Sequence, residues 1–430
     1  MSLKLGRITT IVISSAEIAK KALLTHDQFL SNRTIPQSVS VLNHEHFSLA
    51  FLPVSPLWRE LRKICNGELF AHKTLDDSQD VRRNKVQQLL HDVHKSSQIG
   101  EAIDFGKEVF KTTINLLSNT IFSEDLIQPT GTAGEFKDLV TNITKLVGSP
   151  NIADFFPLLQ VIDPQGVKRQ QTKNVAKVLD IFDRLIWKRL KSRESEDSNT
   201  HNDMLDALLN ISKENETMDK NMIEHLAHDI FVAGTDTTTS TLEWAMTELV
   251  LNSEIMLKAK KELEVIGKGK PIEESDIARL PYLQAIIKET FRLHPPVPLL
   301  LPRKAAKEVE LCGFTIPKDA QVFVNVWTIG RDPTLWDNPT LFSPERFLGT
   351  DIDVKGRSFE LAPFGAGRRI CPGIILALRM LLLMLGSLIN SFDWKLEDHM
   401  KSKDMDMEEK FGITLQKAQP LRVVPIKIRN

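Results

Sequence analysis

The eleven residues PFGAGRRICPG, from Pro363 to Gly373, constrain this chain more than any other segment. Gly365 and Gly367 allow backbone angles that other residues avoid, and they let a bulky group come close to the chain. Pro372 suits the first turn of a helix, because the N–H that it lacks would have no partner there. We therefore expect a glycine-lined gap followed at once by a helix.

The single cysteine of this segment would then lie at the N-terminus of that helix. Unpaired N–H groups and the helix dipole favour a thiolate at such a position, and Arg368 and Arg369 add positive charge. A buried cysteine is more often an inert core residue, and that interpretation stays open for a lone Cys371. A stable thiolate beside a gap is, however, what an axial ligand to haem iron requires.

Composition excludes several classes of protein. The formal net charge is -1 over 430 residues, which argues against a nucleic-acid partner, since nucleic-acid binding needs a basic surface. Three cysteines in so long a chain (Cys65, Cys312 and Cys371) form no disulfide framework and predict a reducing compartment. No close pair of Cys or His residues has the spacing of a zinc site.

The pattern along the chain predicts a mainly α-helical fold with small β-sheets. Residues 1–14 read as two strands around a turn, residues 58–276 are mostly helical, and residues 308–326 and the C-terminal segment read as strands. We expect the strands at the two ends of the chain to pair in one sheet, which favours a single domain over residues 1–430. The apolar stretch 374–392 contains Arg379 and Asn390, so we predict a buried core helix there.

The cysteine segment resembles the haem-binding loop of the cytochrome P450 family, the haem-thiolate monooxygenases. The resemblance rests on the FxxGxRxCxG frame, whose residues here are Phe364, Gly367, Arg369, Cys371 and Gly373. It implies the cytochrome P450 fold, in which a long central helix lies over haem b and the cysteine loop lies below it. It also implies that these five residues contact the haem and that the cysteine sulfur binds the iron.

A predicted long helix over residues 222–252 is weak at its centre, where a glycine and five successive Thr/Ser residues lower helix propensity. Its AGTDT segment is similar to the (A/G)Gx(D/E)T motif of the family. The resemblance implies that Asp236 and Thr237 deliver protons and that Ala233 and Gly234 make room for oxygen and substrate. Without the resemblance, the segment could equally be a tolerated weak point in a helix.

Further segments also match the family along the chain. Glu289 and Arg292 lie three residues apart on a predicted helix; alone they could be a surface ion pair of little value. The family completes this pair with the Arg of a PERF segment, here Arg346, and the resemblance implies a structural network. Trp58 and Arg62 form a WxxxR pair, which could also belong to an ordinary amphipathic helix. In the family, such a pair lies over the haem propionates. Arg303 and Arg369 match two further propionate-binding positions of the family.

The family's substrate-recognition segments map to residues 33–56, 231–237, 297–300 and 411–414, which are nearly free of charge. They favour a small apolar substrate held by shape. The pocket residues that the resemblance implies are Ala233, Gly234, Val297, Leu300, Phe411 and Ile413. Segments such as DPQGVKR and FSPERFL resemble the plant subfamily of geraniol 8-hydroxylase and related terpenoid hydroxylases, which implies a terpenoid substrate such as a monoterpene alcohol.

The resemblance also implies partners and a location. Electrons would come from NADPH through NADPH–cytochrome P450 reductase, because the chain has no GxGxxG fingerprint of its own. Arg59, Arg62 and Lys63 are candidates for a basic docking face. Plant microsomal members lie on the cytosolic face of the endoplasmic reticulum and begin with a membrane anchor and a hinge. Met1 aligns with the family's first strand, so we expect a truncated chain that expresses poorly.

Two other functions remain open from the sequence. One is a haem-thiolate isomerase or dehydratase, which needs neither oxygen nor a reductase; the presence of Asp236 and Thr237 argues against it. The other is an inactive, truncated haem-binding product. Turnover without NADPH would favour the first alternative, and a haem-loaded protein that oxidises no apolar probe would favour the second.

Overall fold

A computed structural model describes the chain except for residues 128–132, 195–202, 216, 268–269, 398–399 and 429–430. The α-helices are α1 (Ala16–Lys20), α2 (Asp27–Leu30), α3 (Pro56–Ile64), α4 (His72–Asp77), α5 (Gln79–Ile99), α6 (Phe105–Phe122), α7 (Ala133–Gly148), α8 (Ile152–Phe155), α9 (Val167–Glu194), α10 (Met204–Glu214), α11 (Lys220–Leu251), α12 (Ser253–Gly267), α13 (Pro281–Leu293), α14 (Val326–Ile329) and α15 (Ile374–Ser391). The β-strands are β1 (Ser2–Leu5), β2 (Ile8–Ile13), β3 (Asn32–Arg33), β4 (Ile103–Asp104), β5 (Arg303–Lys304), β6 (Val309–Leu311), β7 (Phe314–Ile316), β8 (Gln321–Val324), β9 (Phe392–Leu396), β10 (Glu409–Lys410), β11 (Gln416–Lys417) and β12 (Arg422–Lys427). The prediction of a mainly helical fold with small sheets is confirmed.

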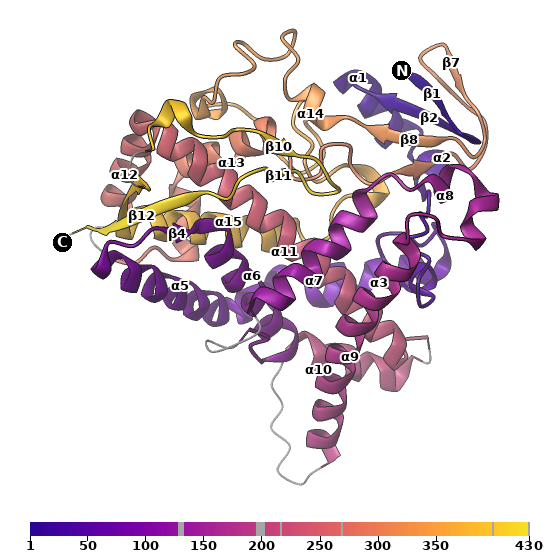
Figure 1. Cartoon of the computed structure of the whole chain (residues 1–430), viewed down its shortest axis with the longest axis horizontal. Coiled ribbons are helices and arrows are strands. Elements are labelled where there is room, and N and C mark those ends of the chain that lie inside the picture. The colour runs from indigo at the N-terminus through magenta and orange to yellow at the C-terminus, as the bar shows by residue number, and fades with distance from the viewer. Residues whose placement is uncertain (128–132, 195–202, 216, 268–269, 398–399, 429–430) are drawn as a thin grey trace.

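The helices form one large body, and the main sheet lies at one corner of it (Figure 1). That sheet has the strand order β1-β2-β8-β5-β3, and a separate three-stranded sheet has the order β4-β12-β9. The N-terminus lies beside the first sheet, and the C-terminus extends from the second on the other side of the view. Two small hairpins, β6-β7 and β10-β11, complete the strands in the described part of the chain.

The two ends of the chain therefore lie in different sheets, and the prediction that they pair in one sheet is wrong. β1 and β2 form the expected hairpin, with Gly6 at a φ of +56° in the turn. β2 then pairs in parallel with β8, because Ile13 and Val324 bury their side chains in the same apolar cluster. β12 instead pairs with β9, which directly follows the long helix α15.

The central helix α11 runs through the middle of the helical body and contacts α6, α7, α9, α13 and α15 (Figure 1). Its predicted range of 222–252 agrees with the observed Lys220–Leu251. The Asp219 side chain caps its start by accepting a hydrogen bond of 2.8 Å from the Met222 amide. Because neighbours surround it, α11 is buried over most of its length, and Trp244 is fully buried.

Helix α15 is the only helix among the described residues that is long and apolar enough to cross a membrane. In this fold 61 % of its apolar window is buried inside the protein. It packs against α5, α11, α12 and α13, as predicted for a core helix. Its N-terminus follows directly after the cysteine loop, so the packing of α15 fixes the end of that loop.

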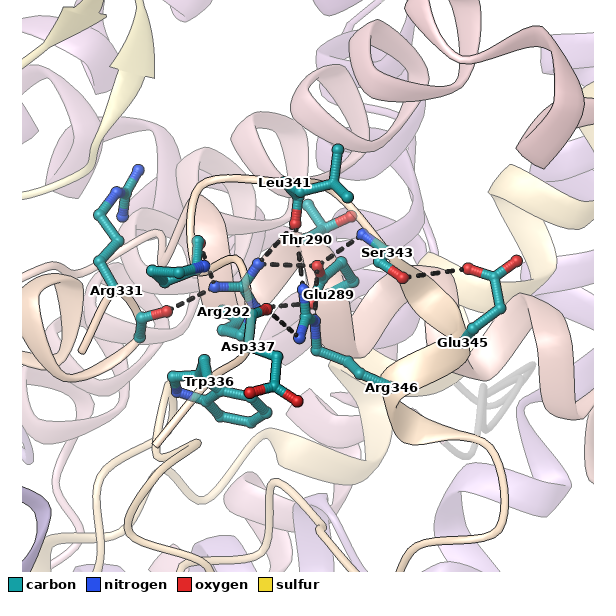
Figure 2. Close-up of polar contacts among 12 residues, drawn as sticks. Glu289, Thr290, Arg292, Arg331, Trp336, Asp337, Leu341, Ser343, Glu345 and Arg346 are labelled. Carbon is teal, nitrogen blue, oxygen red and sulfur yellow. Dashed lines mark hydrogen bonds and ion pairs between the residues drawn. The ribbon is translucent and has the colours of Figure 1, made fainter. Parts of the chain in front are cut away.

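The side chain of Glu289 on α13 is the centre of a buried ionic network (Figure 2). Arg292 donates two hydrogen bonds of 2.7 Å to its carboxylate, one to each oxygen. Arg346 donates a third of 3.0 Å, and the Ser343 amide donates a fourth of 2.7 Å. The side chains of the first pair are fully buried, so this pair is not a surface ion pair.

Carbonyl groups of the chain that crosses α13 take up the other donors of Arg292. Its guanidinium donates to Gly330 and Pro339 at 2.6 Å and to Leu341 at 3.0 Å, as Figure 2 shows in part. The ring of Trp336 lies 5.4 Å from the guanidinium carbon. None of these groups lines the main cavity described below, so the network fixes α13 and the 330–347 segment in place.

Replacing Glu289 tests this role. The change Glu289→Gln leaves two buried guanidiniums without a countercharge, so the free energy of unfolding should fall by about 3–5 kcal/mol. Urea unfolding of the purified protein measures the change. The variant Glu310→Gln, on an exposed position of β6, is the control and should unfold like the unchanged protein. Equal stability of both variants would contradict the role.

Candidate active site

A cavity of about 340 Å³ lies between the central helix, the cysteine loop and the loop after α13. Its wall is mostly apolar and combines segments far apart in the sequence. Of the predicted site residues, the wall contains Trp58, Arg62, Ala233, Gly234, Thr237, Val297, Leu300, Arg303, Phe364, Arg369, Cys371, Gly373 and Ile413. The fold thus brings most of the predicted site residues together around one cavity.

The thiol of Cys371 faces this cavity from the end of the cysteine loop. Its amide donates a hydrogen bond of 3.0 Å to the Phe364 carbonyl, and α15 begins at Ile374 after Gly373. Burial raises the pKa of the Cys371 thiol, while the Gly373 amide and the Arg62 guanidinium act in the opposite direction. The thiol is therefore costly to ionise alone, and a bound metal cation would make it a stable thiolate.

The predicted charges beside this thiol require a correction. Arg368 points outward, is about half exposed, and pairs with Asp27 at 3.2 Å. Arg369 turns away from the sulfur and donates to the Ser31 carbonyl at 2.8 Å. The cation that acts on the thiol is instead Arg62, whose guanidinium donates to the carbonyl next to Cys371, that of Ile370, at 2.7 Å.

The two loop glycines serve different purposes. Both have left-handed backbone angles, with φ of +69° at Gly365 and +67° at Gly367. Gly365 lines the cavity, as expected for a close approach by a ligand. Gly367 does not, because a Cβ there would lie 2.2 Å from the Leu23 carbonyl oxygen. The expectation that Gly367 makes room for a ligand is wrong, since the group that approaches it is the chain's own backbone near α2.

Four guanidiniums surround one side of the cavity: those of Arg33, Arg62, Arg303 and Arg369. Arg303 donates to the Ala366 carbonyl at 3.1 Å and pairs with Asp27 at 3.3 Å. The guanidinium carbon of Arg369 lies 4.4 Å from the ring centroid of Trp58. We did not predict Arg33; only its place at the start of the 33–56 segment hinted at it.

These guanidiniums carry more positive charge than the described residues around them balance. Burial, and then repulsion from Arg303 and Arg369, lower the pKa of Arg33 well below its usual range. Burial, and then repulsion from Arg303 and Arg62, lower the pKa of Arg369 to about 9. Asp27 is the one carboxylate among the described residues that pairs with this group. A ligand with two carboxylates beside the cavity would relieve the repulsion, so the thiol and the guanidiniums together fit haem b with its two propionates.

The opposite wall of the cavity comes from α11. Thr237 lines it and donates its hydroxyl hydrogen bond to the Ala233 carbonyl at 2.7 Å. Asp236 points away from the cavity and accepts a hydrogen bond of 2.7 Å from Gln416. Burial raises the pKa of Asp236, although the nearby polar side chains of Thr414, Thr144 and Gln416 act against this. The predicted pair thus consists of a hydroxyl on the wall and an acid behind it.

One predicted pocket residue lies outside the cavity. Phe411 is 61 % exposed, whereas Ile413 lines the wall two residues later. Both follow β10 in the turn of the β10-β11 hairpin. Gly148 at the end of α7 fits so closely against this turn that a Cβ there would lie 2.0 Å from the Ile413 amide nitrogen. This contact holds Ile413 over the cavity and leaves the ring of Phe411 outside, so that part of the prediction is wrong.

Several wall residues were not predicted individually. Helices α7 and α9 contribute Ile143, Val147 and Val175 to the wall. The segment after β3 contributes His44, and α11 contributes Asp229. Helical periodicity marks Ile143 and Val175 only as buried positions, which are core positions in most proteins. The pairing of histidines and an acid in HLAHD was the one available signal for the polar part of the wall.

Comparisons with known proteins agree with this geometry. The family model described as "Cytochrome P450" matches residues 1–422. Geraniol 8-hydroxylase of Catharanthus roseus is 55% identical over 99% of this chain and 86% of its own length, and that of Swertia mussotii is 53% identical over the same shares. A solved zebra fish cytochrome P450 structure with abiraterone has a similar fold, with a TM-score of 0.81 at 23% identity over 100% of this chain and 96% of that one.

Overpacking the contact between α7 and the hairpin turn should disturb the cavity. In Gly148→Ala the new methyl group forces α7 and the turn apart, which should cost about 1–3 kcal/mol of stability and weaken the binding of apolar ligands. Thermal unfolding and ligand titration measure both effects. Gly67→Ala is the control, because a Cβ at Gly67 meets no atom within 4 Å. Unchanged ligand binding in Gly148→Ala would show that this contact does not shape the cavity.

Proposed function

The chain belongs to the cytochrome P450 family, and on that premise we propose that it binds haem b through Cys371 and hydroxylates a small terpenoid alcohol. Membership of the family implies a haem-dependent monooxygenase that receives electrons from a reductase partner. The observation that carries the proposal is the partly buried Cys371 thiol, which faces an apolar cavity beside an excess of guanidinium charge. The two relatives named for geraniol hydroxylation support the substrate class and do not favour an isomerase or an inactive product.

Arginine side chains hold the cofactor in this proposal. Arg62, Arg303 and Arg369 would neutralise and orient the propionates, Arg33 would add a fourth guanidinium, and Trp58 would keep Arg369 in place by stacking. The thiolate of Cys371 would hold the iron. When bound, haem b supplies the activation of oxygen and its transfer to a C–H bond, and the protein supplies position, protons and a dry site.

Proton supply falls to Asp236 and Thr237. The raised pKa of Asp236 lets this carboxyl hold a proton more readily than an exposed one. Its Oδ2 atom is buried and has no hydrogen-bond partner in the described part of the chain. The Thr237 hydroxyl, one residue further on, opens onto the cavity. We assign to the acid the role of proton source and to the hydroxyl the role of holding the proton at the cavity wall.

The reductase is proposed to be NADPH–cytochrome P450 reductase at the cytosolic face of the endoplasmic reticulum, as the family resemblance implies. Arg59 and Lys63 are exposed on α3 and support a basic docking surface for it. Arg62 is not part of that surface, because it turns inward to the cysteine loop. If these exposed cations contact an acidic partner, the association should weaken as the salt concentration rises.

The iron ligand is tested by Cys371→Ser. The variant should lose the carbon-monoxide difference band of a thiolate-ligated haem, because a serine hydroxyl does not replace a thiolate. The matched control is Cys312→Ser, since Cys312 is an exposed cysteine far along the chain from the loop. The control should keep the full band. A thiolate-type band that survives in Cys371→Ser would overturn the assignment.

The proton-delivery pair is tested by Asp236→Asn and Thr237→Ala. Both variants should keep the thiolate-type band, while product formation falls by roughly 10²-fold and oxygen uptake becomes uncoupled from product. Thr235→Ala removes a hydroxyl that also bonds back along α11, at 2.7 Å to Phe231, but that does not line the cavity. This control should stay coupled. Equal uncoupling in all three variants would mean that the effect comes from helix distortion.

A further inference from the structure

We propose that Asp229 anchors the substrate: its carboxylate accepts a hydrogen bond from the hydroxyl group of an alcohol and so presents the far end of the molecule to the Cys371 side of the cavity. This inference rests on the function proposed above and deepens it, because it names the chemical group by which the substrate is recognised. It also predicts which end of the substrate is oxidised.

Position along α11 is the first support. Asp229, Ala233 and Thr237 are spaced by four residues, lie along one side of the helix, and all line the cavity. At 1.5 Å per residue, Asp229 lies about 12 Å along the helix axis from Thr237. The carboxylate thus lies near the start of the part of α11 that lines the cavity, and the predicted proton-delivery hydroxyl lies about two turns further along.

The charge of the cavity wall is the second support. Among the described residues that line the cavity, Asp229 is the only acidic one. The cations of the wall are the four arginines that fit the propionates, so they are not available to a substrate. Most of the remaining wall is apolar, and its other polar side chains, such as Gln171 and His228, are neutral and are weaker acceptors than a carboxylate. A substrate hydroxyl that entered this space without a partner would lose its hydrogen bonds to water, which disfavours binding.

Asp229 is held in place by the segment after β3. Its carboxylate accepts hydrogen bonds from the Ser48 hydroxyl at 2.8 and 3.1 Å and from the Ala50 amide at 3.3 Å. The Nε2 atom of His44 lies 3.1 Å from it. The single hydroxyl proton of Ser48 is shared between the two oxygens, so this set of donors leaves the carboxylate room to accept another. The side chain keeps 12% of its surface exposed.

The protonation states suit an acceptor. Burial alone would raise the pKa of Asp229, but His44 and His228 outweigh it and hold the pKa of this carboxyl below its usual range. Burial and the nearby His44 lower the pKa of His225 to about 3, so that imidazole is neutral. An ionised carboxylate only accepts hydrogen bonds, which selects a substrate with an O–H group over a hydrocarbon or an ether.

The length of a monoterpene alcohol matches this arrangement. Eight bonds separate the hydroxyl oxygen of geraniol from its carbon 8, and an extended chain of eight bonds spans about 10 Å at the spacing of an extended backbone. An alcohol anchored at Asp229 would therefore reach the level of Ala233 and Thr237 with its far end. The name of the two geraniol 8-hydroxylases describes oxidation at that end of the same alcohol.

A purely structural role for Asp229 is the competing explanation, because the same carboxylate ties the 44–50 segment to α11. Ser48→Ala separates the two roles. It removes the hydroxyl donor to the carboxylate and loosens the tie, but it leaves the acceptor in the cavity. A change in alcohol binding that occurs in Asp229→Asn and not in Ser48→Ala therefore reports on the acceptor itself.

The experiment measures equilibrium binding of geraniol and of its deoxy analogue 2,6-dimethylocta-2,6-diene to the purified haem-loaded protein. The shift of the haem absorption band and equilibrium dialysis give the dissociation constants. The unchanged protein should bind the alcohol at least as tightly as the hydrocarbon. Asp229→Asn should weaken alcohol binding by about tenfold and leave hydrocarbon binding unchanged. Ser48→Ala should preserve the preference for the alcohol.

Three other outcomes would each refute the anchor. If the unchanged protein binds the alcohol about tenfold more weakly than the hydrocarbon, the hydroxyl has no partner in the cavity, and the anchor is refuted even if Asp229→Asn does not fold. If Asp229→Asn and Ser48→Ala weaken both ligands equally, the role is structural and the anchor is again refuted. If a protein with a thiolate-type band binds neither ligand, the proposed substrate class fails and the anchor fails with it.

Discussion

A thiol and four guanidiniums gathered around one cavity are the constraint on which the rest of this structure depends. Removing guanidinium groups from water is expensive unless each finds a countercharge. Asp27 is the one carboxylate that pairs with this group in the described chain, and burial together with repulsion lowers the pKa of Arg33 and Arg369. The four cations come from α3, β3, β5 and the cysteine loop. A dianionic cofactor therefore stabilises the contacts between these segments as well as its own site.

Arginine charges inside this protein are balanced in two ways. Around Glu289, two arginines meet a carboxylate and a set of carbonyl groups, so the network is satisfied by the chain alone (Figure 2). Around Cys371 the guanidinium charge exceeds the carboxylate charge of the described residues, and a bound dianion would balance it. The first arrangement is suited to holding α13 in place. The second is suited to binding, because the unpaired charge makes the ligand part of the folded state.

Features that depend on local spacing could be predicted from the sequence. The loop around Cys371, the position of Thr237 on the cavity wall and the pairing of Glu289 with Arg292 follow from short motifs on one element each. Predictions failed where a distant segment decides the outcome. Gly367 packs against the backbone near α2, and Phe411 turns outward because Gly148 approaches its hairpin.

The unpredicted residues show the same limit more clearly. Arg33 and Asp229 each contact a residue that is distant in the sequence. Ser48 donates a hydrogen bond to Asp229, 181 residues away, and Arg33 donates one to the carbonyl of Leu301, 268 residues away. No periodicity or motif within one segment reports such a contact. Likewise, Val175 has the pattern of a core residue, and only the packing of α9 over the cavity makes it part of the wall.

The central claim is that the sulfur of Cys371 binds the haem iron. Resonance Raman spectroscopy of the ferric protein, prepared with natural cysteine and with cysteine labelled by a heavy sulfur isotope, tests it most directly. We expect an iron–sulfur stretching band that moves to lower frequency with the heavy isotope. A spectrum without an isotope-sensitive band, or with the iron–nitrogen band of a histidine ligand, would contradict the account.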